Sequence, residues 1–335
     1  MTLSSTVHDA AVAILKKLET AIQRRQRLIS QWGDRTTAYR LVNSGADGFS
    51  GLTVDRLGPC LLVEVHRREI DSTPLVSALE QLFADTPIFI KHRWSRSSEK
   101  RSGFLAAGPQ MSPNFEVLEN GLRFQVRLAD DEHIGLFLDS RLPREWVAAH
   151  SRDRRVLNLF SYTGGFGMAA AMGGARSTVN IDNKNSALTY ARQNYERNRL
   201  SFDQRTFFKC DVLYYLKRAA SQKGRFDLII LDPPPRFKRR RQRDFLAHRD
   251  YAGLLVQCVS VLAPNGIILA GLNALKADDT QLTQFIADAA HTTHTRIQTC
   301  DILTAHADFP PTEDRPTSRF AILEVTIPPT PTATM

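Results

Sequence analysis

The chain has 335 residues, 42% of them hydrophobic, which is enough for a large core and suggests two domains rather than one. The 44 Lys and Arg residues outnumber the 35 Asp and Glu residues, and the net charge of +9 is compatible with a polyanionic partner. The four cysteines show no metal-ligand spacing and no apolar run reaches the ~20 residues of a membrane span, so we expect a cytoplasmic protein without a metal or a membrane partner.

The first third of the chain predicts a helix followed by a small α+β region. Apolar and basic side chains recur at helical spacing over residues 5–30, which predicts an amphipathic helix. Its basic face could contact RNA, or it could be solvated while the opposite face packs on the domain. Residues 39–64 alternate like strands, with glycines at the turns. After them we expect a helix over 74–84, a strand over 87–91, and a hairpin over 115–127 that turns at Asn120-Gly121.

The second half of the chain alternates short apolar runs with helical stretches. The expected strands are 156–160, 178–181, 226–231, 266–270 and a closing strand at 319–327, and the expected helices are 165–172, 185–198, 212–221, 245–262 and 280–290. This alternation predicts a Rossmann-like α/β fold, with a mostly parallel sheet and helices on both faces. The expected segments are an N-terminal helix (1–38), a small α+β domain (39–110), a hairpin linker (111–140), the α/β domain (141–330) and a tail (331–335).

Acidic side chains follow three of the predicted strands. The first strand runs into the glycine-containing segment NLFSYTGGFG, and Asp182 ends the second strand roughly 20 residues on, where an acid binds ribose hydroxyls in nucleoside-binding folds. A third short strand is followed by Lys209-Cys-Asp211, and the fourth strand, 226–231, is followed by Asp232. The segment GFGMAA also matches a dinucleotide fingerprint, but a lone match is weak evidence for a nicotinamide enzyme. The repeated acids favour S-adenosylmethionine (SAM), with one carboxylate for the ribose and one near the adenine.

Three longer segments carry a family resemblance. NLFSYTGGFGMAAAMGGA, VNIDNKNSALTYARQNYERN and FDLIILDPPPRF resemble the methyltransferase domain of bacterial large-subunit (23S) ribosomal RNA methyltransferases, both the cytosine-5 enzymes and their guanine-modifying relatives. The resemblance extends upstream through LVNSGADGFSGLTVDRLG and HIGLFLDSR, so it covers roughly residues 39 to 335. It implies SAM as the cofactor and a class I methyltransferase fold.

The resemblance also implies a set of cofactor-binding residues. The segment after the first strand would wall the cofactor, Asp182 would hold its ribose, and Asp211 would lie near its adenine. Residues of GLFLDSR would close over the methionine end. The whole implied set is Phe137, Asp139, Arg141, Phe160, Ser161, Tyr162, Thr163, Gly164, Asp182, Asn183, Asp211 and Val212.

One acid, three prolines and a basic run follow the fourth strand in the sequence LDPPPRFKRRRQRDF. Asp232 can accept hydrogen bonds from the N–H groups of a base, and Pro233 and its neighbours fix the backbone beside a base that has left its stack. The cations are candidates to bind the flanking phosphates, unless they form only a solvated loop. They are Arg236, Lys238, Arg239, Arg240, Arg241 and Arg243.

The chain departs from the cytosine-5 enzymes after the fifth strand. Methylation of cytosine carbon 5 needs a cysteine thiolate that adds to the ring, and the relatives carry Ser-Cys-Ser at this place. This chain reads Leu269-Ala-Gly-Leu-Asn273 instead. A ring nitrogen or an exocyclic amine needs no covalent assistance, so Asn273 could contribute to recognising guanine, or it could be a helix N-cap.

We therefore expect a SAM-dependent RNA methyltransferase that modifies a base nitrogen of 23S rRNA, with guanine favoured, either on free RNA or in an assembling subunit. Asp232, Pro233 and Asn273 are the candidate catalytic residues. Two other functions stay open from the sequence: an RNA-binding protein that keeps a SAM pocket without catalysis, and a methyltransferase of small molecules, which would not need the basic run.

Overall fold

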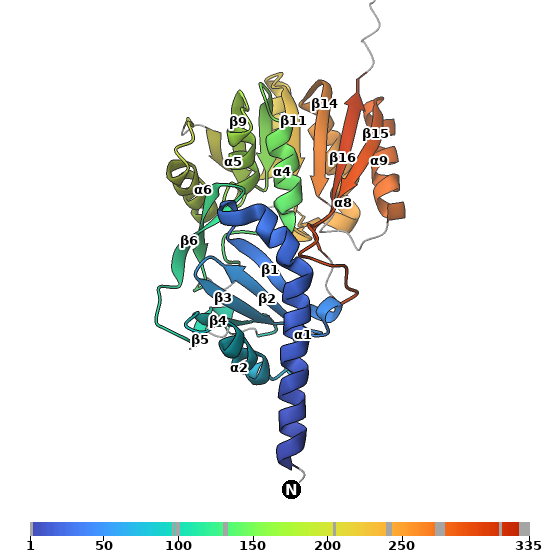
Figure 1. The fold of residues 1–335 in the computed structure, drawn as a ribbon. Coiled ribbons are helices and arrows are strands. Elements are labelled where there is room, and N and C mark those ends of the chain that lie inside the picture. Colours follow the sequence, from blue (N-terminus) through green and yellow to red (C-terminus); the bar gives the residue numbers. More distant parts are fainter. Residues whose placement is uncertain are drawn as a thin grey trace, which may run out of the picture. The chain divides into compact units, whose positions relative to one another are not determined.

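The computed structural model describes residues 3–95, 97, 101–129, 133–203, 206–238, 243–271, 279–314 and 317–327 (Figure 1). Contacts along the chain divide it into two units. Unit 1 contains Met1–Arg141 and Ala305–Thr317, and unit 2 contains Leu142–Thr304 and Ser318–Met335. Unit 1 thus combines the N-terminal segments with the stretch Ala305–Thr317. The sequence pattern did not predict that this later stretch belongs with the N-terminal segments.

Unit 1 is built on a five-stranded sheet in the order β1-β2-β3-β4-β5. All neighbouring strands are antiparallel except β3 and β4, which are joined through α2. The elements are α1 (Leu3–Trp32), β1 (Ala38–Asn43), β2 (Leu52–Leu57), β3 (Cys60–Val65), α2 (Thr73–Leu82), β4 (Ile88–His92), β5 (Phe104–Ala107), β6 (Asn114–Glu119) and β7 (Leu122–Arg127). The hairpin β6–β7 turns at Asn120 and Gly121, which both have positive φ, as its Asn-Gly signal predicts.

The two faces of this sheet differ in polarity. Leu61, Val63 and Val65 of β3 belong to a core that also includes side chains of α1 and α2. Because side chains alternate along a strand, Leu62 and Glu64 point to the other face. One face of the sheet therefore packs against the helices, and the other face is more polar.

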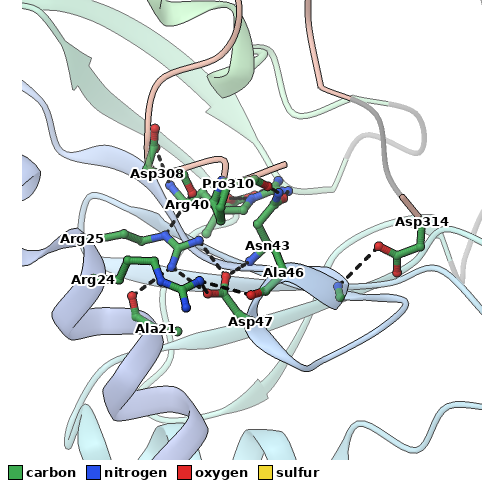
Figure 2. A network of polar contacts seen from close by, with 12 residues as sticks. Ala21, Arg24, Arg25, Arg40, Asn43, Ala46, Asp47, Asp308, Pro310 and Asp314 are labelled. Carbon is green, nitrogen blue, oxygen red and sulfur yellow. Dashed lines mark hydrogen bonds and ion pairs between the residues drawn. The ribbon is translucent and has the colours of Figure 1, made fainter. Parts of the chain in front are cut away.

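Buried charges hold the returning segment 305–317 to unit 1 (Figure 2). Arg25 is fully buried on α1; its Nε donates to the Asp308 carbonyl at 2.9 Å and its NH2 donates to Asp47 Oδ2 at 2.7 Å. Asn43 Nδ2 donates to the carbonyl of Pro310 at 2.7 Å. Arg24 also pairs with Asp47 at 2.7 Å. Two of the basic residues on the predicted helix therefore serve internal contacts, which supports the packing interpretation at these positions.

Unit 2 is a seven-stranded sheet in the order β10-β9-β8-β11-β14-β16-β15. The first five strands are parallel, and β16 runs antiparallel to both its neighbours, which confirms the Rossmann-like fold. The short helix η3 (Leu138–Ser140) still belongs to unit 1, and α4 (Arg141–Ala149) leads from its last residue into unit 2. The later elements are β8 (Arg155–Leu159), α5 (Gly165–Met172), β9 (Ser177–Asp182), α6 (Asn185–Arg197), β10 (Phe207–Lys209), α7 (Val212–Ser221), β11 (Phe226–Leu231), β12 (Arg236–Phe237), β13 (Phe245–Leu246), α8 (Ala247–Ser260), β14 (Leu262–Gly271), α9 (Asp279–Thr293), β15 (Arg296–Leu303) and β16 (Phe320–Thr326).

Helices cover both faces of this sheet. Side chains of α7, α8 and α9 join one apolar cluster with Leu157, Leu159 and Ile181 of the strands. The other face carries a buried polar layer, in which Asn158 Nδ2 donates to Asn180 Oδ1 at 2.9 Å, and Asn180 Nδ2 donates to the hydroxyl of Tyr195 on α6 at 3.2 Å. Among the described helices of either unit, none is both long enough and apolar enough to cross a membrane.

Gly167 on α5 lets this helix approach the polar layer. A Cβ at this position would overlap the side-chain oxygen of Asn180 and the hydroxyl of Tyr195. This glycine of the GGFG segment therefore serves helix–sheet packing, whereas Gly164, at φ 81°, serves the turn before the helix.

Two helical glycines provide a matched test of this packing. Gly167→Ala should lower the free energy of unfolding by about 1–3 kcal/mol, because the added methyl overpacks a buried layer. Gly253→Ala on α8 should raise it by about 0.5–1 kcal/mol, because beyond the adjacent residues and backbone of its own helix no described atom lies within 4 Å of the new Cβ, and alanine favours the helix. Urea denaturation of the two variants measures both values, and equal shifts would contradict the assigned role of Gly167.

Candidate functional site

Parallel pairing aligns the ends of four neighbouring strands of unit 2. Leu159 of β8 pairs with Ile181 of β9 and with Leu231 of β11, which in turn pairs with Ala270 of β14. The residues that follow at this carboxyl edge are Phe160, Asp182, Asp232 and Gly271, and Asp211 follows β10 one position beyond Cys210. The strand order reverses between β8 and β11, which is where ligands bind in open parallel sheets.

The loop from Phe160 to Gly164, which we call the β8 loop, has an unusual backbone. Phe160, Tyr162 and Gly164 have φ values of 58°, 47° and 81°. Left-handed conformations are unfavourable for bulky residues and persist where the surroundings impose them, often at functional sites. Here Ser161 N donates to the carbonyl of Ile181 at 2.9 Å, and Gly164 N donates to that of Ser161 at 2.8 Å.

Asp182 ties the β8 loop to the end of β9. Its Oδ2 accepts a hydrogen bond from Tyr162 N at 3.0 Å, and its Oδ1 accepts one from Lys184 N at 2.8 Å. Burial raises the pKa of Asp182, although these backbone donors partly offset the effect. Each carboxylate oxygen has two lone pairs, so further acceptor capacity remains for the hydroxyls of a ribose.

Other residues of the implied cofactor set lie along the same edge. The Ser161 hydroxyl is buried and has no hydrogen-bond partner within the described parts of the chain, so it fits a polar group of a ligand. Asp211 caps α7, with Oδ1 accepting from Tyr214 N at 3.0 Å, and Val212 is buried beside it. Thr163 is buried and its carbonyl accepts from Asn194 Nδ2 at 3.1 Å, while Asn183 is exposed.

Asp232 follows β11 and lies against the end of β14. A Cβ on Gly271 would come within 2.6 Å of Asp232 Oδ1, so the glycine leaves the room that this carboxyl group occupies. Tyr251 of α8 donates its hydroxyl to the Gly271 carbonyl at 2.7 Å, and burial, together with the nearby Asp232 charge, raises the pKa of Tyr251. Pro233 is buried, and Asn273 lies outside the described residues.

Strands β12 and β13 form an antiparallel pair that the sequence pattern did not predict, and the basic run begins in β12. We call the described residues of this pair and its flanks, 236–238 and 243–246, the basic hairpin. Phe237 stacks on Phe245 with ring centroids 4.6 Å apart and contacts Phe160 of the β8 loop at 5.2 Å. These aromatic contacts fix the base of the hairpin beside the β8 loop.

The described cations of this hairpin face solvent. Arg236 pairs with Asp244 at 2.7 Å, and Arg243 pairs with Asp250 at 3.0 Å. Lys238 is exposed. The other three candidate cations, Arg239, Arg240 and Arg241, fall outside the described residues.

Three residues of the implied cofactor set belong to unit 1. Phe137 is 42% exposed and contacts His133, with ring centroids 4.8 Å apart, and Asp139 is half-buried in η3. Arg141 is fully buried: its NH2 donates to the Ala38 carbonyl at 2.6 Å and its guanidinium lies 4.1 Å from the centre of the Trp32 ring. Their role toward the cofactor stays a prediction.

Comparison with known proteins shows which family the chain is similar to. A family model described as S-adenosylmethionine-dependent methyltransferase matches residues 84–315. The proteins named ribosomal RNA large subunit methyltransferase I from Aeromonas salmonicida and Cronobacter sakazakii are 31% and 32% identical to the chain, over 88% of its length and 75% of theirs. A crystal structure described as a methyltransferase, SMU.776, complexed with S-adenosylhomocysteine (SAH), is 27% identical, with a TM-score of 0.84 over 94% of this chain and 81% of that one.

The position of Asp182 leads to a prediction about SAH binding. Asp182→Asn should weaken SAH binding roughly thirtyfold, the equivalent of about 2 kcal/mol for hydrogen bonds to a charged group. In the parent protein, affinity should fall as the pH drops through the pKa of Asp182, because protonation removes the charged acceptor. Since burial raises that pKa above the ordinary 3.8, the fall should begin at a higher pH than for an exposed aspartate.

Titration calorimetry with SAH over a pH series measures both effects, with Asp288→Asn on the exposed side of α9 as the control. Unchanged affinity in Asp182→Asn would contradict the ribose assignment.

The fold, the aligned acids and the buried Ser161 hydroxyl all suit a nucleoside ligand at the carboxyl edge of unit 2. The family match includes Leu142–Thr304 of unit 2 together with part of unit 1. The chain therefore belongs to the S-adenosylmethionine-dependent methyltransferase family, and S-adenosylmethionine is its cofactor.

Proposed function

We propose that this enzyme methylates a base of large-subunit ribosomal RNA, at a guanine nitrogen rather than at cytosine carbon 5. The observation that carries the proposal is Asp232, a hydrogen-bond acceptor at the carboxyl edge beside a basic hairpin. The names of the relatives from Aeromonas salmonicida and Cronobacter sakazakii support ribosomal RNA as the substrate.

The state of the four cysteines supports a nitrogen target. A cysteine that attacks a pyrimidine ring needs a lowered pKa, so that a thiolate is available. Burial raises the pKa of Cys60 to about 12, and burial also raises the pKa of the fully buried Cys258 on α8. Burial and then the Asp211 charge raise the pKa of Cys210, and the pKa of exposed Cys300 on β15 is also raised. None of these thiols has the environment of a nucleophile.

Orientation of the base is the task left to the protein. SAM supplies an electrophilic methyl group on a sulfonium, which reacts by in-line displacement when a nucleophilic nitrogen is held close and aligned. Asp232 would accept hydrogen bonds from the N1–H and the amine of guanine, a donor pair that uracil lacks. Asp232 or water would take the proton that the nitrogen loses on accepting the methyl group, and the sulfur would keep the electron pair of its bond to that group.

Charge near the site supports RNA over a small molecule. Phosphates supply most of the affinity of such complexes, and binding that depends on them weakens as salt rises. Arg236 and Arg243 are 64% and 71% exposed in their side chains, and both lie on the hairpin that contacts the β8 loop through Phe237. An RNA strand that passes the site would meet them.

Loss of the Asp232 carboxylate should lower the rate of methyl transfer without lowering the affinity for the cofactor product. Asp232→Ala should reduce methyl transfer to total RNA by about a hundredfold or more, because the base loses its positioning contact, while SAH affinity stays within about twofold. Transfer of tritium from labelled SAM, followed by mass spectrometry of rRNA nucleosides, gives the rate and the modified atom together. Methylguanosine is the expected product. Full activity in Asp232→Ala would contradict the role of this carboxylate.

The chemistry of the target atom can be tested with a trap. RNA that contains 5-fluorocytidine forms a stable covalent adduct with enzymes that attack cytosine through a thiolate, because fluorine cannot leave carbon 5 as a proton does. We expect no adduct in denaturing electrophoresis, and we expect Cys258→Ser and Cys210→Ser to retain methyl transfer. An adduct that disappears in either variant would overturn the proposed nitrogen target.

A further inference from the structure

The second face of the unit 1 sheet carries a cavity of about 210 Å³. Arg40 of β1, Asp55 of β2 and Glu64 of β3 point to this face, away from the core under α1 and α2. The segment 133–139 and Phe309 of the returning segment complete its wall. The cavity is therefore built by the sheet and two segments that cross it.

The floor of this cavity is fixed. Arg40 Nε donates to Asp55 Oδ1 at 2.7 Å and Arg40 NH2 donates to Asp55 Oδ2 at 3.0 Å, a bidentate pair that is almost fully buried. The guanidinium of Arg40 also lies 4.6 Å from the centre of the Phe309 ring. These two charges compensate each other, so the recognition chemistry comes from the remaining lining residues.

The upper part of the cavity combines an accessible ring with charged groups. Phe137 is 42% exposed and presents an aromatic surface. Glu64 and half-buried Asp139 supply carboxylates, and Arg93 forms an ion pair with Glu64, with Nε 3.6 Å from Oε1. An aromatic surface beside acceptors and a guanidinium is the combination that proteins use to bind an unstacked base.

Size and charge restrict the ligand. Pockets for whole small molecules typically hold ~300–1,000 Å³, so a cavity of about 210 Å³ suits one ring system rather than an entire nucleoside cofactor. Its charged lining consists of two arginines and three carboxylates, Asp55, Glu64 and Asp139. This excess of negative charge disfavours a phosphate and favours a neutral group with N–H donors.

We propose that this cavity, the unit 1 cavity, binds a single unstacked guanine of the RNA substrate. Phe137 stacks on the base, Glu64 and Asp139 accept hydrogen bonds from its N1–H and amine, and Arg93 donates to its O6 and N7. RNA as the source of the base rests on the proposed function. The other candidate occupant is the amino-acid end of SAM, which the family resemblance of Phe137 and Asp139 suggests, and the experiment separates the two.

Direct binding to the complete chain is the first measurement. We expect GMP to bind in calorimetry without SAM, AMP to bind at least about tenfold more weakly, and L-methionine not to displace GMP. GMP binding is measured in the Asp232→Ala background, which removes the base contact proposed for unit 2. In this background Glu64→Gln should weaken GMP binding about tenfold, since it replaces a charged acceptor with an amide. The control is Glu80→Gln, on α2 over the opposite face. Arg93→Gln is a second variant if Glu64→Gln fails to melt cooperatively.

Kinetics with RNA then distinguish the occupants. We expect Glu64→Gln to raise the KM for RNA about tenfold at an unchanged SAH affinity. Displacement of GMP by L-methionine, or loss of SAH affinity in Glu64→Gln, would assign the cavity to the cofactor and overturn it. Loss of GMP binding in Asp232→Ala alone would overturn it too. If the parent binds GMP through Glu64 yet methylates no RNA, the proposed function fails while the guanine site stands.

Discussion

Parallel pairing at one level is the constraint on which the site of this methyltransferase depends. The register that pairs Leu159 with Ile181 and Leu231 also sets where the next residues emerge. Asp182 and Asp232 belong to different strands and are 50 positions apart, yet they follow paired residues and so reach the same edge of the sheet. A one-residue slip would turn each acid to the opposite face. The backbone hydrogen bonds between the strands therefore determine where the acidic side chains of the unit 2 site lie.

The β8 loop shows how a strained backbone is maintained at that edge. Phe160 and Tyr162 both adopt left-handed conformations, which isolated peptides rarely populate. The carboxylate of Asp182 accepts from Tyr162 N, and the ring of Phe160 contacts Phe237 of the basic hairpin. One loop therefore links the predicted ribose acceptor with the base of the predicted RNA-binding hairpin. The two contacts are made by residues only two positions apart, Phe160 and Tyr162.

The sequence pattern predicted the parts of the fold that depend on local periodicity. Alternation of apolar runs and helices identified the parallel sheet, and Asn120-Gly121 identified the hairpin turn. Three features had no local signal. The left-handed Tyr162 is imposed by a tertiary hydrogen bond, the β12–β13 hairpin depends on ring packing around Phe237, and the edge strand β15 lacks a buried face. The residues of a site can be read from strand ends, but the loops that close it are determined by contacts between distant segments.

The distribution of charge explains why net charge is a weak guide to the RNA-binding surface. Arg25, Arg40 and Arg141 are buried in unit 1, where Asp47, Asp55 and Asp308 compensate them, so they contribute to the +9 of the chain without being presented to a polyanion. Removing one partner of such a buried pair leaves an uncompensated charge, which destabilises the fold. These arginines therefore stay paired inside unit 1. The cations that can reach RNA are the exposed ones, and exposed pairs such as Arg236–Asp244 are weak enough for a phosphate to compete with the carboxylate. Whether a basic residue can bind nucleic acid therefore depends on its exposure and cannot be inferred from the number of basic residues.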